Sequence, residues 1–383
     1  MREHWTLDPG VTFLNHGSFG ACARSILEVQ AELRARLERE PVQFMTRALE
    51  PLLDEARAVL AGVIGADPDD LAFIPNATSG VNTVLRSLRG LGPGDELLVT
   101  DHVYGACWNT MARAAEETGA RLVVASVPFP CAGPDEVVEA VMSRVSERTV
   151  LALVEHVTSP TALVFPLDRL VAALQGRGVD VLVDGAHAPG MVEIDVTRLG
   201  AAYYVGNGHK WLCAPKGVAF LHVRRDRQAR LHPLVTSHGR SSPRTDRSRF
   251  RLEFDWTGTD DPTPALCLPA ALRFLGSLVE GGLAGLRARN HEAAVAARRA
   301  LCAALGVAAP CPDAMVGSMA ALPLPDGGVE LGAELFEVHR IEVPVMHWPE
   351  RPRRLIRISM HAYNRLDDVH RLADVLATLA PAR

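Results

Sequence analysis

Two polar segments, each placed after an apolar run, carry the side chains best suited to chemistry. Asp184 ends the apolar run VDVLVD (179–184), and Lys210 follows the run AAYYV (201–205) after Gly-Asn-Gly-His. Lys210 is one of only two lysines among 40 basic side chains. A lysine in a partly desolvated pocket loses its proton readily and becomes a nucleophile toward carbonyl groups. The pattern predicts an amine and a carboxylate in one cleft.

A lysine and a carboxylate in this arrangement match the needs of pyridoxal phosphate. The lysine holds the cofactor's aldehyde as a Schiff base, and the carboxylate keeps the pyridine nitrogen protonated so that the ring accepts electrons. A phosphate cradle is also required, and Ala77-Thr78-Ser79-Gly80 opens a predicted helix after the run LAFI (71–74). Taken alone, that motif is ordinary helix capping. Tyr104, in preference to His102, is the candidate platform for the ring.

The alternation of apolar runs and helical spacing predicts the elements that position these residues. Near-continuous apolar strands separated by helices are typical of a mainly parallel sheet covered on both faces. Ligands of such sheets bind at the carboxyl ends of the strands. The predicted strands are 71–74, 96–100, 121–127, 149–154, 179–184, 201–205 and 217–223, and the helices between them are 78–89, 104–118, 134–145 and 166–175.

The remaining segments predict a three-part organisation of the chain. Amphipathic helices are expected at 25–39 and 49–64, and further helices at 265–278, 283–305, 330–339 and 366–379. Strands are expected at 319–324, 342–346 and 354–359. We predict a substrate-side segment over 1–20, a large cofactor-binding α/β domain over 21–264, and a small α+β domain over 265–383.

Composition excludes several classes of protein. The 383 residues are 48% hydrophobic and 22% charged, which excludes a largely disordered chain. The formal charge of -5 gives no general attraction to nucleic acid or to an anionic membrane. No apolar run reaches the length of about 18 residues that a membrane span needs, and the seven cysteines form no CxxC pair. We therefore expect a cytoplasmic protein without a metal site, a nucleic-acid partner or a membrane partner.

The order of the motifs resembles the class V aminotransferase family of fold-type I pyridoxal phosphate enzymes. The resemblance runs from about residue 12 to residue 365. Within the family, LNHGSFG (14–20) and GNGHKW (206–211) most resemble the isopenicillin N epimerase-like branch. The other segments that carry the resemblance are NATSG (76–80), DHVYGA (101–106), EHVTSP (155–160), DGAHAPG (184–190), WTGTDD (256–261) and IRISMHAYN (356–364).

This resemblance implies a set of cofactor residues. Lys210 corresponds to the Schiff-base lysine that also moves the α-proton, and Asp184 to the partner of the pyridinium nitrogen. His187 is placed to contact the phenolic oxygen of the ring, with Thr158 or Ser159 as a second contact. The phosphate contacts are expected from Thr78, Ser79, Asn207 and His209.

The resemblance also implies substrate contacts and a partner. Arg357 would form a two-pronged contact with the substrate's α-carboxylate, and Asn15 and His16 would line the substrate side. Thr259 would reach the phosphate of a neighbouring subunit, which implies a homodimer with shared sites. The chain lacks a cysteine between Asp326 and Arg357. Because sulfur transfer as a persulfide needs a thiolate nucleophile, desulfurase activity is disfavoured.

The sequence does not decide between enzymes whose reactions begin with the same proton abstraction from the α-carbon of the substrate. These are an epimerase or racemase, an aminotransferase, and a carbon–sulfur β-lyase that acts on a cysteine conjugate. A metal-dependent hydrolase is a distant alternative, with the ligand candidates Asp184, His187, His102, His156 and His209, although their spacing matches no metal motif. A non-catalytic binding protein is a third class, which would make Lys210 dispensable.

The segment GRSSPRTDRSRFR (239–251) has two interpretations. Its five arginines are offset within the stretch only by Asp246. The segment is either a solvated loop or an anion-binding flap over the active site that recognises a second acid group of the substrate.

Overall fold

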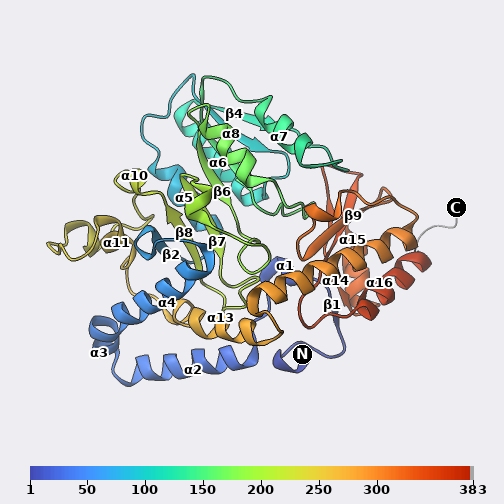
Figure 1. Cartoon of the computed structure of the whole chain (residues 1–383), viewed down its shortest axis with the longest axis horizontal. Coiled ribbons are helices and arrows are strands. Elements are labelled where there is room, and N and C mark those ends of the chain that lie inside the picture. The colour runs from blue at the N-terminus through green and yellow to red at the C-terminus, as the bar shows by residue number, and fades with distance from the viewer. Residues whose placement is uncertain (380–383) are drawn as a thin grey trace.

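A seven-stranded sheet forms the centre of the computed structural model, which describes residues 1–379 (Figure 1). The strand order is β2-β8-β7-β6-β5-β3-β4. Strands β3 to β7 run parallel, and β8 runs antiparallel to both of its neighbours. The strands are β2 (Leu71–Ile74), β3 (Glu96–Thr100), β4 (Arg121–Ala125), β5 (Thr149–Glu155), β6 (Asp180–Asp184), β7 (Tyr203–Asn207) and β8 (Ala219–Val223).

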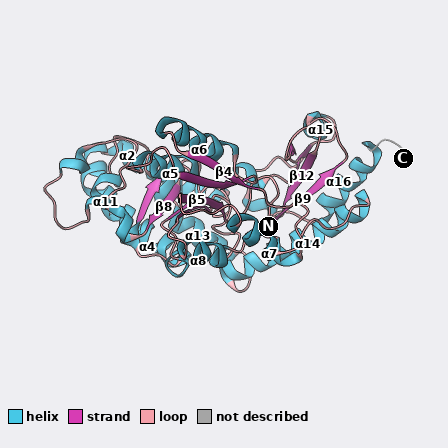
Figure 2. Cartoon of the chain, turned by 90° about the horizontal axis from the view of Figure 1, so that it is seen from above, coloured by secondary structure: helices cyan, strands magenta, loops and turns pink. Residues whose placement is uncertain are grey.

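Helices cover both faces of this sheet, as the sequence predicts (Figure 2). On one face, α5 (Ala77–Ser87) and α6 (Gly105–Thr118) pack on side chains such as Leu97, Leu153 and Leu182. On the other face, α7 (Pro134–Met142) and α8 (Leu167–Gln175) pack on their strand neighbours, among them Leu98 and Val154. Consecutive side chains of a strand point to opposite faces. A strand that is buried on both faces is therefore apolar throughout.

A second, three-stranded antiparallel sheet lies in the C-terminal part of the chain, in the order β11-β12-β9. The N-terminal strand β1 (Thr12–Phe13) pairs in parallel with β10 (Ile341–Glu342), which ties the first residues to this part. The C-terminal elements are β9 (Met319–Leu324), α15 (Glu330–Glu337), β11 (Val345–His347), β12 (Arg354–Ser359), α14 (Gly282–Leu305) and α16 (Leu366–Leu379).

The helices near the predicted domain boundary contact both parts of the molecule. Residue 265 lies inside α12 (Thr263–Leu266), and α13 (Leu268–Ser277) contacts α14 as well as α2 (Arg24–Arg39) and α4 (Leu49–Ile64). The division at residue 265 therefore stays a prediction. No single helix of residues 1–379 has the length and apolar composition of a membrane span, although the bent pair 263–277 and 282–305 has them together.

Two predicted elements differ from the structure because of prolines. The run 342–346, predicted as one strand, forms parts of β10 and β11, which pair with different strands on either side of Pro344. Proline has no N–H to donate to a ladder, so it breaks the strand. The helix predicted over 265–278 begins at Thr263 and is interrupted at Cys267, with prolines in the first turns of both halves.

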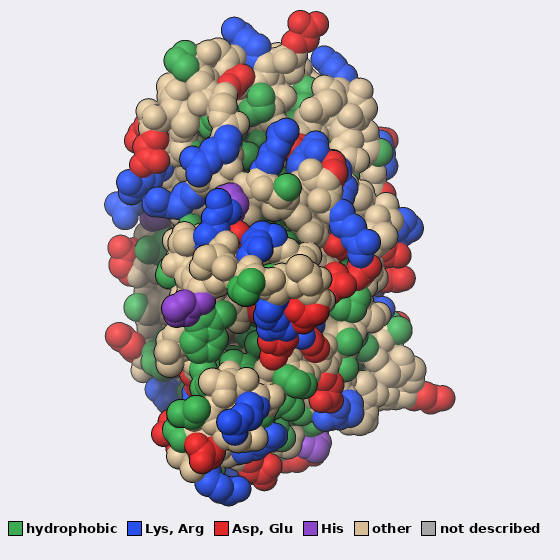
Figure 3. All heavy atoms as spheres, turned by 90° about the vertical axis from the view of Figure 1, so that its left-hand side faces the viewer, with side chains coloured by type: hydrophobic (Ala, Val, Ile, Leu, Met, Phe, Trp, Pro, Cys, Tyr) green, Lys and Arg blue, Asp and Glu red, His purple; other side chains and the backbone are tan. Residues whose placement is uncertain are grey.

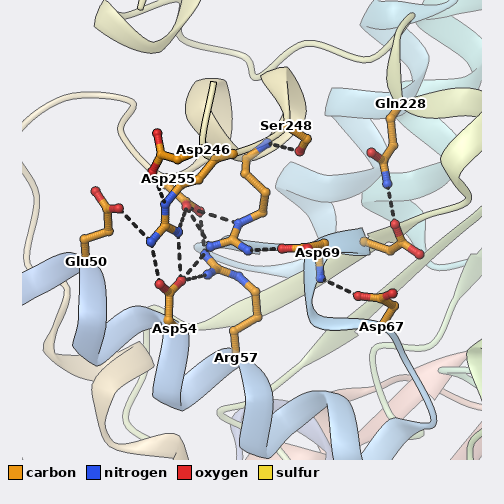
Figure 4. Close-up of polar contacts among 12 residues, drawn as sticks. Glu50, Asp54, Arg57, Asp67, Asp69, Gln228, Asp246, Ser248 and Asp255 are labelled. Carbon is orange, nitrogen blue, oxygen red and sulfur yellow. Dashed lines mark hydrogen bonds and ion pairs between the residues drawn. The ribbon is translucent and has the colours of Figure 1, made fainter. Parts of the chain in front are cut away.

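The arginine-rich stretch is mostly exposed to solvent, as the first of its two interpretations predicts, and ion pairs hold several of its arginines. It packs against α4, where Arg244 pairs with Glu50. Asp54 on the same helix pairs with both Arg247 and Arg251 (Figure 4). Arg240 pairs with Glu253. On the face of the molecule where α11 (Arg249–Phe254) lies, basic and acidic side chains are interspersed (Figure 3).

The remaining arginine of the stretch, Arg249, binds the backbone carbonyls of Gly239 and Ser242. None of the five arginines lines the cavity described below. Acids on α4, about 190 residues away in the sequence, therefore neutralise part of this stretch, together with nearby acids such as Glu253 and Asp255. The hypothesis of an anion-binding flap over the active site of the same chain is corrected.

Asp54 is the hub of this network. It accepts hydrogen bonds from Arg57, Arg247 and Arg251, and the side chains of Arg57 and Arg251 are only 1% and 5% exposed. Burial raises the pKa of Asp54, but the hydrogen bonds from Arg247 and Arg251 outweigh it and lower the pKa to about 2. The stability that Asp54 contributes is therefore present above its unfolded pKa and is lost as the pH falls toward 2.

We predict that Asp54→Ala lowers the free energy of unfolding by about 2 kcal/mol, because two buried guanidinium groups each lose a partner. Urea denaturation at pH 7 measures this loss. The matched control is Glu50→Ala, one turn earlier on α4, whose partners are more exposed. It should cost less than about 1 kcal/mol. Equal losses in the two variants would contradict the role of Asp54.

Candidate active site

A cavity of about 340 Å³ lies at the carboxyl ends of β5, β6 and β7. Its wall also includes the first residues of α5, Tyr104 at the start of α6, and the N-terminal residues Ser18 and Phe19. This is the edge of the sheet at which ligands of parallel α/β folds bind. Lys210, Asp184 and His187, the three predicted catalytic residues, all line it.

Lys210 lies in the turn that follows β7, and its Nζ is 3.4 Å from Nε2 of His187. Burial and, to a smaller extent, the positive charge of Arg357 lower the pKa of Lys210 to about 8, against the opposing effect of Asp184. A substantial fraction of this amine is neutral near pH 8, whereas an exposed lysine is almost fully charged there. Lys210 is therefore suited to act as a nucleophile and as a base.

Asp184 ends β6 with its carboxylate held by two donors. Oδ1 accepts the backbone N–H of Ala186 at 3.0 Å, and Oδ2 accepts the thiol of Cys107 at 3.3 Å. Burial raises the pKa of Cys107 well above its usual value, so the thiol stays protonated and remains a donor. Cys107 lies on α6, and no motif in the sequence indicated its contact with Asp184.

Glu155 is a second acid in the cavity wall that the sequence did not single out. It ends β5 and is the register partner of Asp184 on β6. Its Oε2 accepts the hydroxyl of Thr100 at 2.8 Å, and its Oε1 has no partner among the described residues. Burial raises the pKa of Glu155 to about 8. Glu155 is therefore mostly neutral at pH 7 and adds little negative charge beside Asp184. Its place as the last residue of an apolar strand was the signal that could have identified it.

His187 is buried and neutral. Burial, with the positive charge of Lys210, holds its pKa well below the usual value. Its Nδ1 has no hydrogen-bond partner among the described residues, although the atom is inaccessible to solvent. An unpartnered buried nitrogen is costly unless a ligand supplies the missing bond. The ring of His187 therefore fits the predicted contact with an oxygen of a bound group.

The N-terminus of α5 meets the end of β7 at the cavity wall. Oδ1 of Asn207 accepts the N–H of Ala77 at 2.9 Å, which joins the strand to the helix. A side chain on Gly80 would come within 2.5 Å of Val205 on β7, so glycine is needed for this close approach. Thr78, Asn207 and His209 line the cavity as predicted for a phosphate site.

Ser79 departs from its predicted role as a cofactor contact. Its hydroxyl and its N–H both donate to Oδ1 of Asn76, the N-cap residue of α5. It is also absent from the cavity wall, which Asn76 lines instead. Ser79 therefore serves the cap of the helix, which is the simpler explanation of that motif.

The two candidates for the ring platform lie in different places. Tyr104 is 49% exposed and lines the cavity. His102 is fully buried, and its ring nitrogens bond to the hydroxyl of Thr161 and the carbonyl of Val127. The geometry therefore leaves Tyr104 as the candidate.

Arg357, on β12, places a buried positive charge directly behind the cavity wall, which it does not itself line. Its Nη1 donates to the carbonyl of Ser159 and its Nη2 to the hydroxyl of Ser18, two residues that line the wall. Its Nε has no partner, and no carboxylate among the described residues forms an ion pair with it. Burial lowers the pKa of Arg357 to about 10, so it is still charged at neutral pH. A buried cation without a counter-ion favours an anionic ligand.

Two predicted substrate contacts do not line the cavity. His16 is fully buried behind Lys210, where it bonds to the backbone of that residue. Asn15 bonds to Glu342 and to the hydroxyl of Ser18. The prediction placed the right segment at the site, but Ser18 and Phe19 supply its cavity wall.

The positions of Thr158, Ser159 and Thr259 bear on two further predictions. Thr158 is buried, and its hydroxyl bonds to Thr161 and to the N–H of Leu163, so Ser159 is the one of the pair that lines the cavity. Thr259 is exposed on the loop between α11 and α12 and does not line the cavity of its own chain.

Of the residues proposed as metal ligands, Asp184, His187 and His209 line the cavity, but His102 and His156 do not. His156 bonds to the hydroxyl of Tyr204, and His102 lies behind the wall. Among residues 1–379, the one cluster with ligand atoms close enough for a metal is His16, Cys213 and His361, which shares no member with the proposed set. The geometry therefore does not assemble the hydrolase site.

Comparisons with known proteins identify the family of this chain. The family model described as aminotransferase class-V matches residues 23–372. An isopenicillin N epimerase from Amycolatopsis lactamdurans is 39% identical over 99% of this chain and 98% of its own length. A probable chloroplastic L-cysteine desulfhydrase from Arabidopsis thaliana is 31% identical over 96% of this chain and 83% of its own. The solved structure of a cystine C–S lyase with its product cysteine persulfide has a TM-score of 0.83 at 22% identity, over 97% and 99% of the two chains.

The amine of Lys210 gives a direct test of the cavity's electrostatics. We predict that acetylation of Lys210 in the cofactor-free protein rises with pH around a midpoint near 8, because burial disfavours the charged amine. Peptide mass spectrometry after brief labelling measures this. Lys216, the other lysine, is the internal control, because its side chain is more exposed even though burial lowers its pKa as well. A Lys210 midpoint near 10.5, the usual lysine value, would contradict the buried position.

Proposed function

Because this chain belongs to the class V aminotransferase family, we propose that it epimerises or racemises the α-carbon of an amino acid or amino-acid conjugate. The fold is the predicted fold-type I architecture, and the family's cofactor is pyridoxal phosphate. The observation that carries the proposal is that a buried amine, Lys210, lines the cavity, and a buried guanidinium, Arg357, lies directly behind the cavity wall, bonded to Ser159 and Ser18. The near-full-length identity to isopenicillin N epimerases supports epimerisation.

The residues of the cavity fit the cofactor. The unpartnered Nδ1 of His187 and the carboxylate of Asp184 are available to polar atoms of a ring, and Tyr104 is available to its face. Thr78, Asn207 and His209 would hold the phosphate at the start of α5, where the helix dipole favours an anion. Ser159 would provide a further polar contact.

The chemistry then follows from how each side chain is charged. When bound, pyridoxal phosphate withdraws electrons from the α-carbon of the attached amino acid and so weakens its Cα–H bond. Lys210, whose pKa is lowered to about 8, accepts the proton. Arg357 binds the α-carboxylate through two parallel hydrogen bonds and fixes which bond at Cα faces Lys210. Delivery of a proton from water to the opposite face, with release to water of the proton held by Lys210, would give the epimer.

A carbon–sulfur β-lyase is the second candidate. The L-cysteine desulfhydrases from Arabidopsis thaliana and Oryza sativa are 30–32% identical to this chain over at least 96% of its length. Loss of a β-substituent begins with the same proton transfer to Lys210, and so does transamination. The same residues therefore serve all three reactions.

We also propose that the active unit is a cytoplasmic homodimer. Thr259 is exposed and absent from the cavity of its own chain, which supports a contribution to the neighbour's phosphate site. All seven cysteines are free thiols, which fits a reducing compartment. Sedimentation of the holoenzyme tests the dimer, and a fully active monomer would contradict it.

The reaction is tested by incubating the holoenzyme in deuterated water with amino acids and cysteine conjugates. Epimerisation predicts deuterium at Cα and the appearance of the opposite configuration, which mass spectrometry and chiral chromatography detect. Release of pyruvate would instead identify the lyase, and amination of the cofactor would identify a transaminase. Borohydride reduction should attach the cofactor to Lys210, and Lys210→Ala should abolish turnover. Turnover that survives this substitution would contradict the mechanism.

Arg357→Ala should lower kcat/KM for α-amino acids by about 10- to 150-fold, mainly through KM, because hydrogen bonds to charged groups contribute about 1.5–3 kcal/mol. Arg298→Ala is a matched control, since Arg298 is equally buried but pairs with Asp313. It should lower stability without a selective change in KM. An unchanged KM in Arg357→Ala would mean that the carboxylate binds elsewhere.

A further inference from the structure

Residues 15–20, which we call the anchor segment, lie directly against the backbone that carries Lys210. A side chain on Gly20 would come within 2.1 Å of the carbonyl of His209 and 2.8 Å of Cα of Lys210. The φ of Gly20 is +70°, a conformation that favours glycine. Lys216 Nζ also donates to the carbonyl of Gly20 at 3.0 Å. The anchor segment is therefore in contact with the lysine turn at its back.

The carbonyl of Lys210 accepts two hydrogen bonds. One comes from the N–H of Cys213 at 3.0 Å, which closes a turn over residues 210–213. The other partner is Nε2 of His16, also at 3.0 Å. Both lone pairs of this carbonyl are thus used, and one of them is used by the anchor segment.

The contacts of His16 fix where its proton lies. A carbonyl only accepts, so Nε2 must carry the proton that it donates to Lys210. Burial lowers the pKa of His16 to about 3, so its ring is neutral and Nδ1 is an acceptor. The hydroxyl of Tyr363, 2.6 Å from Nδ1, must then be the donor. The result is a chain of two hydrogen bonds, in which Tyr363 donates to His16 and His16 donates to the backbone carbonyl of Lys210.

Packing around this chain leaves His16 little freedom to rotate. Its ring stacks on that of His361 at 4.3 Å between centroids and lies 4.7 Å from the ring of Trp211. Tyr363 packs edge-on against Trp5 at 5.0 Å. His16, His361 and Tyr363 are all at most 3% exposed.

The other side of the anchor segment holds Arg357. The hydroxyl of Ser18 is 3.3 Å from Nη2 of Arg357, and it donates to Oδ1 of Asn15. A side chain on Gly17 would come within 2.3 Å of the sulfur of Met319. One segment of six residues therefore contacts both the amine-bearing turn and the guanidinium group.

We propose that His16 is a positioning residue, which holds the backbone of Lys210 through the Tyr363–His16–Lys210 chain and fixes the amine relative to Arg357. This inference rests on the proposed function of Lys210 as the base. A misplacement of about 1 Å at such a group costs on the order of 100-fold in rate. Loss of these hydrogen bonds should therefore reduce kcat more than it changes KM.

A double-mutant cycle tests the chain with the holoenzyme. His16→Leu removes both hydrogen bonds and should lower kcat by about 10- to 100-fold with KM nearly constant. Tyr363→Phe removes only the distal donor and should have a smaller effect, and the double variant should be no slower than His16→Leu. His16→Gln, which keeps a donor near the position of Nε2, should recover part of kcat. Independent, multiplicative losses would overturn the proposal.

A second readout needs neither cofactor nor turnover. In the cofactor-free protein, His16→Leu should move the acetylation midpoint of Lys210 upward from about 8, because a released lysine reaches solvent. The midpoint of Lys216 should not move. Tyr204→Phe is the matched control, since it deletes a buried tyrosine–histidine hydrogen bond, to His156, away from this chain. It should leave both midpoints unchanged.

The outcomes separate this inference from the proposed function. An unchanged Lys210 midpoint in His16→Leu would overturn the positioning role, and so would equal shifts of Lys210 and Lys216, which would indicate displacement of the whole segment. Failure of the wild-type protein to bind pyridoxal phosphate would instead overturn the proposed function. The labelling result would still decide whether His16 holds the lysine turn.

Discussion

Two positive charges lie close enough to repel each other, Lys210 in the cavity wall and Arg357 behind it, and the rest of the site is arranged around that constraint. Arg357 lacks a carboxylate partner among the described residues and lowers the pKa of Lys210. Asp184 opposes this effect, while Glu155 is kept mostly neutral by burial. Removal of a cation from water is costly, and a like charge nearby adds to the cost. The cavity therefore favours a ligand that brings negative charge and allows Lys210 to be neutral.

This constraint explains why the site needs two parts of the chain. The central sheet brings Asp184 and Lys210 to neighbouring strand ends, whereas Arg357 comes from β12 of the C-terminal sheet. The anchor segment joins them, because β1 before it pairs with β10 and its own residues contact Lys210 and Arg357. The anchor segment is near the N-terminus in the sequence but lies between the two parts of the site in the structure. The distance between amine and guanidinium is thus set by contacts between residues hundreds of positions apart.

Much of this site could be predicted where a local pattern fixed the geometry. Asp184 and Lys210 follow apolar strands, and the predicted bounds of 71–74, 96–100, 319–324 and 354–359 agree with the strands observed. His16 could not be placed, because its burial depends on Tyr363 and Lys210, which the fold brings to it. The two interpretations of the arginines of 239–251 could not be separated for the same reason, since several of their acid partners lie on α4. Ser79 is the opposite case, because helix capping, a local interaction, fully explains its place in the sequence motif.

The central claim is that Lys210 and Arg357 share one electrostatic environment. The most direct measurement is the titration midpoint of the Lys210 amine in the cofactor-free protein, with and without a simple monocarboxylate such as acetate. The account predicts that acetate raises the midpoint, because an anion on Arg357 cancels the repulsion that lowers the pKa of Lys210, and that Arg357→Ala abolishes this response. A midpoint that acetate does not change in the wild-type protein would contradict the account.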